Sequence, residues 1–283
     1  VRVRVRTHLT IKQLRDRLSE AKDEVQKAYD QLEIDNARKT EELETARVIQ
    51  KGFLPVSPPE LPYLEIAAFQ KPATEVGGDY YDFFAQSDGQ LLLAIGDATG
   101  HGVGASLMVS ATKTALLAID EPNLTEKLNK MNTILKQINS HRLLNMALVL
   151  IELSENANSQ TIQVKAVGGG IPPLYILWSN GSIEKITIKG MPLGLTESAK
   201  YTPTEFRLEK SDVLILMSDG LPERLNDKDE MLSDVRLVAY IEKAGKTKLS
   251  ATGILEALVE YGNDWSNNTP QNDDLTLVVL KVK

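Results

Sequence analysis

The chain of 283 residues contains no cysteine, only three histidines and few aromatic side chains, 5% of the total. The absence of cysteine excludes disulfide bonds, thiolate metal ligands and a cysteine nucleophile, and it is typical of a reducing compartment. No apolar run approaches the ~20 residues that a membrane-spanning helix needs, and there is no signal peptide. We therefore expect a cytoplasmic protein with no membrane segment in this fragment.

The chain is acidic, with a net charge of −7, and 42% of its residues are hydrophobic. This apolar content suffices for a sizeable core and excludes a disordered chain. The negative charge argues against nucleic acid as a partner. Because the first residue is Val1 rather than methionine, we expect the sequence to be a fragment of a longer protein.

Residues 1–50 differ from the rest, because no glycine or proline occurs before Gly52. The opening residues VRVRVR alternate as in a strand, or form a basic linker. Apolar residues then follow a heptad spacing at Leu14, Leu18, Ala21, Val25, Ala28 and Leu32. Beyond Leu32 the regular spacing falls on polar residues, and a four-residue stutter restores apolar residues only from Leu43, so the middle of the seam is polar either way. The pattern favours a dimeric coiled coil over a single amphipathic helix that packs on its own domain.

Residues 51–283 indicate a second domain, which begins with a proline-rich segment, GFLPVSPPELP. Short apolar segments typical of strands follow it, with helical patterns near 104–119, 124–139, 230–243 and 249–262. Asp88-Gly89 and Asn180-Gly181 are expected to form hairpin turns. Most strands are joined to neighbouring strands, so we predict an α+β fold with antiparallel sheets rather than a doubly wound parallel sheet.

Carboxylates recur at the ends of the expected strands, beside glycine or strong apolar runs. They lie in GGDYYD (Asp79, Asp82), IGDATG (Asp97), LMSDGL (Asp219) and QNDDLTL (Asp273, Asp274). A single Asp-Gly is usually only a turn. Four such places are harder to explain as turns alone. In an antiparallel sandwich several strand ends can meet at one edge, where carboxylates would repel one another unless cations lay between them.

The available ligands favour hard cations, because carboxylates dominate and thiolates are absent. Two Mn²⁺ or Mg²⁺ ions could share a carboxylate and a water, which they would activate for attack on a phosphate. The glycines after Asp97 would let the backbone approach a metal, so that the carbonyl of Ala98 becomes a ligand.

The glycine-rich segment GDATGHGVG has other interpretations. Its spacing, G-x-G-x-G, departs from the dinucleotide fingerprint G-x-G-x-x-G, and no P-loop motif is present. His101, within the loop, could orient water or act as an acid. It could equally pack under the loop and bond to its backbone.

Five motifs in this order resemble the metal-dependent PPM serine/threonine phosphatases, in the bacterial branch of SpoIIE and RsbU-like proteins. These motifs are TEVGGDYYDFF, GDATGHGVGASLM, GMPLGL, MSDGLPE and NDDLTLVVLKV, and the resemblance covers about residues 52–283. Relatives often have Asn-Ala-Gly-His where this chain has VGGG at 167–170, so Gly170 occupies the position of that histidine.

The resemblance implies two stacked antiparallel sheets flanked by helix layers, an α-β-β-α sandwich, with two Mn²⁺ or Mg²⁺ ions at one edge. It implies that Asp97 bridges the metals, that Ala98 offers its carbonyl, and that Asp79 lies on the side of the first metal. Asp219 and Asp273 would bind the second metal. Four further positions are candidates for contacts with the substrate or with the ligands, namely Asp82, Gly100, His101 and Asp274.

The implied activity is hydrolysis of phosphoserine or phosphothreonine on a partner protein, with a STAS-type anti-sigma-factor antagonist as the expected substrate. The helical head would form a homodimer and transmit a signal from an upstream sensor or membrane region. Two alternatives remain open. The domain could be a signalling scaffold with vestigial catalysis, or a hydrolase of a small phosphoester.

Overall fold

The structure, a computed structural model, describes the chain except for residues 1, 87–88, 139–143, 157–160, 246 and 248, and side chains are described from residue 12. Contacts divide the chain into two units, residues 1–46 and residues 47–283. Helix α1 (Arg2–Lys51) contains most of the first unit and ends within the second. Among the described helices, none is both long enough and apolar enough to cross a membrane.

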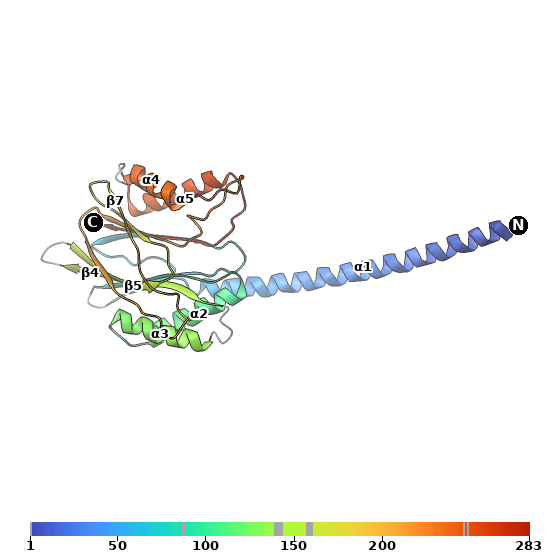
Figure 1. Cartoon of the computed structure of the whole chain (residues 1–283), viewed down its shortest axis with the longest axis horizontal. Coiled ribbons are helices and arrows are strands. Elements are labelled where there is room, and N and C mark those ends of the chain that lie inside the picture. The colour runs from blue at the N-terminus through green and yellow to red at the C-terminus, as the bar shows by residue number, and fades with distance from the viewer. Residues whose placement is uncertain (1, 87–88, 139–143, 157–160, 246, 248) are drawn as a thin grey trace. The chain divides into compact units, whose positions relative to one another are not determined.

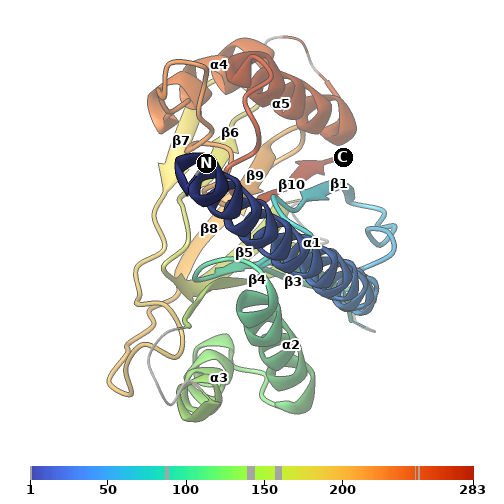
Figure 2. The same cartoon turned by 90° about the vertical axis from the view of Figure 1, so that its right-hand side faces the viewer.

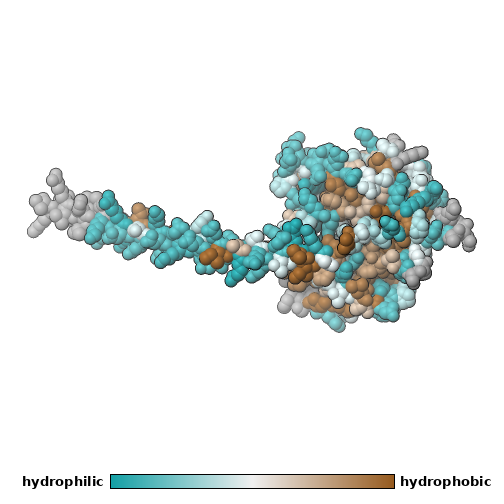
Figure 3. All heavy atoms as spheres, turned by 180° about the vertical axis from the view of Figure 1, so that it is seen from behind, coloured by the Kyte–Doolittle hydropathy of each residue, from teal (hydrophilic) through white to brown (hydrophobic). Residues whose placement is uncertain are grey.

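The first unit is a continuous helix, so the VRVRVR segment is helical from Arg2 and is neither strand nor irregular linker. A run rich in Glu, Lys, Arg, Leu and Ala, without glycine or proline, favours this conformation. The heptad residues Leu14, Leu18, Val25 and Leu32 are 57–70% exposed. Figure 3 shows that most of this unit's surface is hydrophilic, with few apolar side chains.

The second unit contains two five-stranded antiparallel sheets, with strand orders β1-β10-β9-β6-β7 and β2-β3-β4-β5-β8. The strands of the first sheet are β1 (Leu64–Lys71), β10 (Leu275–Val282), β9 (Val213–Met217), β6 (Leu174–Leu177) and β7 (Ile183–Ile186). Those of the second sheet are β2 (Asp79–Ala85), β3 (Leu91–Ala98), β4 (Met146–Asn156), β5 (Thr161–Gly169) and β8 (Thr204–Leu208).

Four helices cover the outer faces of the two sheets (Figures 1 and 2). They are α2 (Val103–Ala118), α3 (Leu124–Ile138), α4 (Asp234–Gly245) and α5 (Ala251–Ser266). One apolar cluster lies between the sheets, a second joins the β2–β8 sheet to α2 and α3, and a third joins the β1–β7 sheet to α4 and α5. The predicted α-β-β-α sandwich is thus confirmed.

The four helices after the first unit occur within a few residues of their predicted positions, but strand β2 was not among the apolar segments that predicted strands. Its residues, DYYDFFA, attracted attention for their carboxylates rather than for their alternation. The Asn180-Gly181 hairpin is present between β6 and β7, where Gly181 has φ 88° and donates to the carbonyl of Trp178 at 2.8 Å. Asp88, the first residue of the other expected turn, lies outside the described residues.

Candidate metal centre

Asp79 and Asp97 face each other on adjacent strands. They are direct partners in the antiparallel register of β2 and β3, Asp79 as the first residue of β2 and Asp97 as the last but one of β3. Residues opposite each other in such a pair have Cβ atoms ~5 Å apart. Strand pairing alone therefore brings two carboxylates to one edge of the sheet.

Glycine permits the loop after β3 to approach this pair. A Cβ atom at Gly78 would lie 2.8 Å from the carbonyl oxygen of Ala98 and 3.0 Å from that of Gly100. The amide of Ala98 donates to the carbonyl of Gly78 at 3.0 Å. Gly100 and Gly102 adopt φ of 84° and 79°, a region that favours glycine. The Ala98 and Gly100 carbonyls are thus held against the backbone that leads into Asp79.

Asp219 and Asp273 lie at the equivalent end of the other sheet. Asp219 follows β9 and Asp273 precedes β10, and these strands are paired antiparallel. At the end of this ladder, the amide of Ser218 donates to the carbonyl of Thr276 at 3.0 Å. Gly220 packs so closely on the backbone carbonyl of Asp274 that a side chain would not fit.

Two side chains connect the two sheets at this edge. The hydroxyl of Ser218 donates to the carboxylate of Asp79 at 2.8 Å. The carboxylate of Asp274 accepts hydrogen bonds from the amide of Ala73 at 2.7 Å and from the amide of Gly78. Asp274 is only 3% exposed. It therefore holds the loop before β2 in place, which is a structural role that the sequence did not reveal.

Burial, with repulsion between neighbouring carboxylates added to it, raises the pKa values of three acids in the cluster. Burial raises the pKa of Asp79 to about 8, an effect that the Thr276 and Ser218 hydroxyls oppose. Burial, followed by the charges of Asp79 and Asp219, raises the pKa of Asp97 to about 9. Burial and the charge of Asp273 raise the pKa of Asp219 to about 6. A nearby positive charge would favour the charged form of each of these carboxyl groups.

The donor set fits hard divalent cations in its chemistry, since it consists of carboxylate and backbone carbonyl oxygens. The described residues contain no group of three or more His, Asp or Glu side chains that could already hold one ion. The raised pKa values of Asp79, Asp97 and Asp219 nonetheless reflect burial first and then repulsion between the carboxylates. A divalent cation would relieve this repulsion, because it favours the charged form of each carboxyl group.

Asp82 does not belong to this cluster. Three residues along β2 from Asp79, it lies on the opposite face of the strand, where it forms a 2.8 Å ion pair with Lys113 of α2. The hydroxyl of Tyr80 donates to the same carboxylate at 3.0 Å. The predicted contact of Asp82 with substrate or ligands is therefore replaced by a buried attachment of α2 to the sheet.

His101 is exposed within the glycine loop. The loop is fixed on either side of it: before it, the amide of Thr99 donates to the carbonyl of Asn145 at 2.9 Å, and after it, the amide of Gly102 donates to the carbonyl of Val76 at 3.2 Å. The structure thus offers His101 to solvent rather than packing it under the loop.

Two glutamines that sequence reasoning missed support the backbone around Asp79. The side-chain amide of Gln70 donates to the backbone carbonyl of Asp79 at 2.8 Å. Gln50, in the last turn of α1, donates to the carbonyl of Gly77 at 2.6 Å and accepts from its amide at 3.1 Å. A single glutamine is not part of a recognisable sequence motif, so these contacts could be identified only from the structure.

The family described as Stage II sporulation protein E (SpoIIE) matches residues 87–283, which is more than half of the chain. The chain belongs to the SpoIIE family. Its relatives include the phosphoserine phosphatase RsbU of Bacillus subtilis, 26% identical over 247 residues, which cover 86% of this chain and 70% of RsbU. Protein IcfG of Synechocystis is 26% identical over 264 residues. This match covers 84% of this chain but only 41% of IcfG.

Solved structures share the SpoIIE-family fold. The SiaA-PP2C domain of Pseudomonas aeruginosa superposes with a TM-score of 0.72 at 20% identity, covering 88% of this chain and 98% of that domain. The PP2C phosphatase domain of SpoIIE from Bacillus subtilis, with a fragment of its regulatory domain, gives a TM-score of 0.62 at 22% identity, covering 78% and 63%. At these identities the likeness concerns the fold alone.

Proposed function

We propose that residues 51–283 form a metal-dependent protein serine/threonine phosphatase. The observation that carries this proposal is the convergence of four carboxylates, Asp79, Asp97, Asp219 and Asp273, at one edge of the sandwich, three of them with raised pKa values. Family membership supports the same activity, since the relative RsbU is named a phosphoserine phosphatase. The proposed substrate is a phosphorylated STAS-type anti-sigma-factor antagonist.

In this proposal the ligands divide between the two sheets. Asp97 would bridge two ions, with Asp79 and the Ala98 carbonyl on one side and Asp219 and Asp273 on the other. When bound, two Mn²⁺ or Mg²⁺ ions would lower the pKa of a water molecule and would neutralise charge on the phosphate oxygens. Ser218 holds the Asp79 carboxylate through its 2.8 Å hydrogen bond. Hydrolysis would break the bond between phosphorus and the serine oxygen, with the oxygen of a water molecule attacking phosphorus and the proton that this water loses passing to the serine oxygen.

The test is hydrolysis of a phosphoserine peptide and of p-nitrophenyl phosphate, with Mn²⁺ and with EDTA. We expect Mn²⁺-dependent release of phosphate from both, which EDTA abolishes. Turnover of phosphorylated metabolites in preference to the peptide would instead support a small-phosphoester hydrolase. Metal binding without turnover of any substrate would support a scaffold with vestigial catalysis.

We further propose that the helix before the domain carries regulation. The last residues of α1 lie within the second unit, where Gln50 is bonded to Gly77, two residues before Asp79. Lys113, the partner of Asp82, also donates to the carbonyl of Phe53 at 2.5 Å. A rotation of this helix end would therefore reach both the loop before β2 and helix α2. An upstream sensor, cytoplasmic or tethered to a membrane, would supply the signal.

Deleting residues 1–45 is expected to convert a homodimer into a monomer, because the exposed heptad residues would be removed. Light scattering would show the mass halved, and phosphatase activity would change because the signal-carrying helix is lost. The double variant Leu18→Asn/Val25→Asn should give the same change in mass while retaining the full length. If the deletion left both mass and activity unchanged, the dimeric coiled coil would be wrong.

A further inference from the structure

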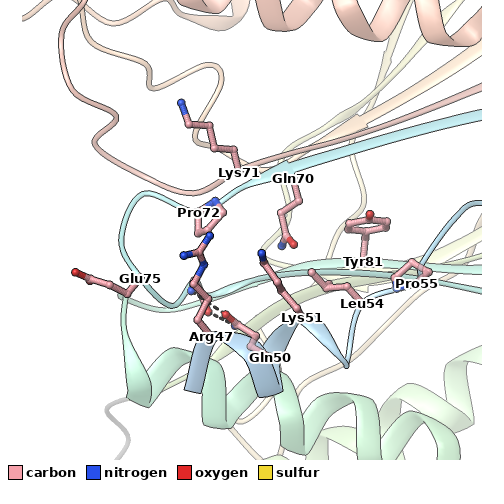
Figure 4. Close-up of a pocket in the computed structure, with 11 residues that line it drawn as sticks. Arg47, Gln50, Lys51, Leu54, Pro55, Gln70, Lys71, Pro72, Glu75 and Tyr81 are labelled. Carbon is pink, nitrogen blue, oxygen red and sulfur yellow. Dashed lines mark hydrogen bonds between the residues drawn. The ribbon is translucent and has the colours of Figure 1, made fainter. Parts of the chain in front are cut away.

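A pocket of about 400 Å³ lies beside the candidate metal centre, between the last turn of α1 and the end of β1 (Figure 4). All of its lining residues belong to the second unit. Leu54, Pro55 and Tyr81 supply apolar surface. In Figure 4, Arg47 and Lys51 project from the helix end toward the strand that carries Gln70, while the Lys71 amino group points outward at the rim. The pocket thus combines an apolar wall with basic groups.

The charge of this pocket is opposite to that of the protein. Three cations line it, Arg47, Lys51 and Lys71, against one acid, Glu75. The whole chain has a net charge of −7, and the neighbouring metal centre is itself a cluster of carboxylates. An acidic protein that binds a phosphorylated substrate must overcome repulsion, and a local positive potential lowers that barrier.

Hydrogen bonds and a short stretch of backbone join the pocket to the metal centre. Gln70, on its wall, donates to the carbonyl of Asp79. The side-chain amide of Gln271 donates both to the backbone carbonyl of Lys71 at 2.7 Å and to that of Asp273 at 2.8 Å. Gly77 lines the pocket and lies two residues before Asp79, about 7 Å along an extended chain. A peptide whose phosphoserine reaches the metal centre would place neighbouring residues within reach of the pocket.

We propose that this pocket binds an acidic side chain of the phosphoprotein substrate, two to four residues from the phosphoserine by the ~3.3 Å rise of an extended chain. This inference rests on the proposed function. Lys51, with Arg47 beside it, would pair with the carboxylate, and Leu54 and Tyr81 would cover its methylene groups. The pocket would thereby select substrates by sequence, separately from the hydrolysis of the phosphate.

The experiment compares two phosphoserine peptides that differ only in glutamate or glutamine at the flanking positions, on both sides of the phosphoserine. With the full chain and Mn²⁺, we expect Lys51→Glu to lower kcat/KM for the glutamate peptide about tenfold. The glutamine peptide and p-nitrophenyl phosphate should change by less than about twofold, because neither uses the pocket. Lys71→Glu, at the rim, should have a smaller effect with the same selectivity.

Lys243→Glu is the matched control, because Lys243 is exposed on α4, does not line the pocket and undergoes the same change in charge. If Lys243→Glu lowered kcat/KM for the glutamate peptide as much as Lys51→Glu does, the change in overall charge would explain the effect and the pocket assignment would be wrong. Equal turnover of the two peptides by the unaltered protein would also overturn it, while leaving the phosphatase function intact. Failure to cleave either peptide, with p-nitrophenyl phosphate still cleaved, would count against the proposed function instead. Free glutamate serves as a further probe. If glutamate saturates the pocket and does not inhibit hydrolysis of the glutamate peptide, the assignment of the pocket to the substrate is wrong.

Discussion

Asp97→Asn is expected to lower kcat for the phosphoserine peptide by on the order of 10³-fold or more in the presence of Mn²⁺. The substitution preserves the size of the side chain and the pairing of β2 with β3, but it removes the charge at the centre of the carboxylate cluster. Burial, followed by the charges of the neighbouring carboxylates, raises the pKa of Asp97 to about 9. Steady-state kinetics and Mn²⁺ titration by calorimetry would measure the loss of turnover and of metal affinity together.

The stability of the same variant provides a control, because we expect the substitution to raise the stability of the metal-free protein at pH 8 while it lowers activity. A carboxyl group whose pKa is raised from its ordinary value near 4 to about 9 in the folded state binds a proton more tightly there than in the unfolded chain. Its contribution therefore favours folding at low pH and is lost as the pH rises toward 9. Asparagine has no such titration, so metal-free Asp97→Asn should be more stable than the metal-free wild type at pH 8.

Thermal denaturation in EDTA at pH 5 and pH 8 checks this expectation. An inactive variant that is more stable at pH 8 has lost function without losing its fold. If the variant instead kept substantial Mn²⁺-dependent turnover, Asp97 would not hold the metal and the proposed centre would be wrong. A variant that unfolds under both conditions would contradict the expected stability gain.

The layers of the fold could be predicted because their signals are local. Apolar alternation, hairpin turns such as Asn180-Gly181 and amphipathic helices are each encoded within about a dozen residues, and their order indicated an antiparallel sandwich. Strand β2 was missed because its alternation is interrupted by Asp79 and Asp82, which were considered only as ligands. The carboxylate of Asp79, which belongs to the site, thus helped to hide the strand that positions it.

The roles of individual acids were less predictable, because they depend on pairing between distant segments. Asp79 and Asp82 looked alike in the sequence, yet the pleat of β2 directs them to opposite faces, one toward Ser218 and the other toward Lys113. Asp273 and Asp274 are adjacent, yet the carboxylate of Asp274 is occupied by the amides of Ala73 and Gly78, some 200 residues away. No local pattern contains such information.

Gly220→Ala is expected to lower kcat by about 100-fold or more while the domain remains folded. The Cβ atom of alanine would overlap the backbone carbonyl of Asp274, which cannot move aside as a flexible side chain could. The ends of β9 and β10 must then separate, and overpacking of this kind costs about 1–3 kcal/mol of stability. The separation falls between Asp219 and Asp273, so Mn²⁺ affinity should weaken along with turnover.

Gly104→Ala is the matched control for this substitution. Gly104 also lies near the metal centre, in the first turn of α2, but the nearest atoms to an added Cβ are those of Leu144 at 3.7 Å, an ordinary contact. Alanine is favoured in a helix, so this variant should keep its activity and gain slightly in stability. Equal activity of the two variants would show that the spacing of Asp219 and Asp273 does not govern catalysis. A loss confined to Gly220→Ala would show that the β1–β7 sheet contributes to the site through the approach of two strand ends, which Ser218 then couples to Asp79 on the β2–β8 sheet.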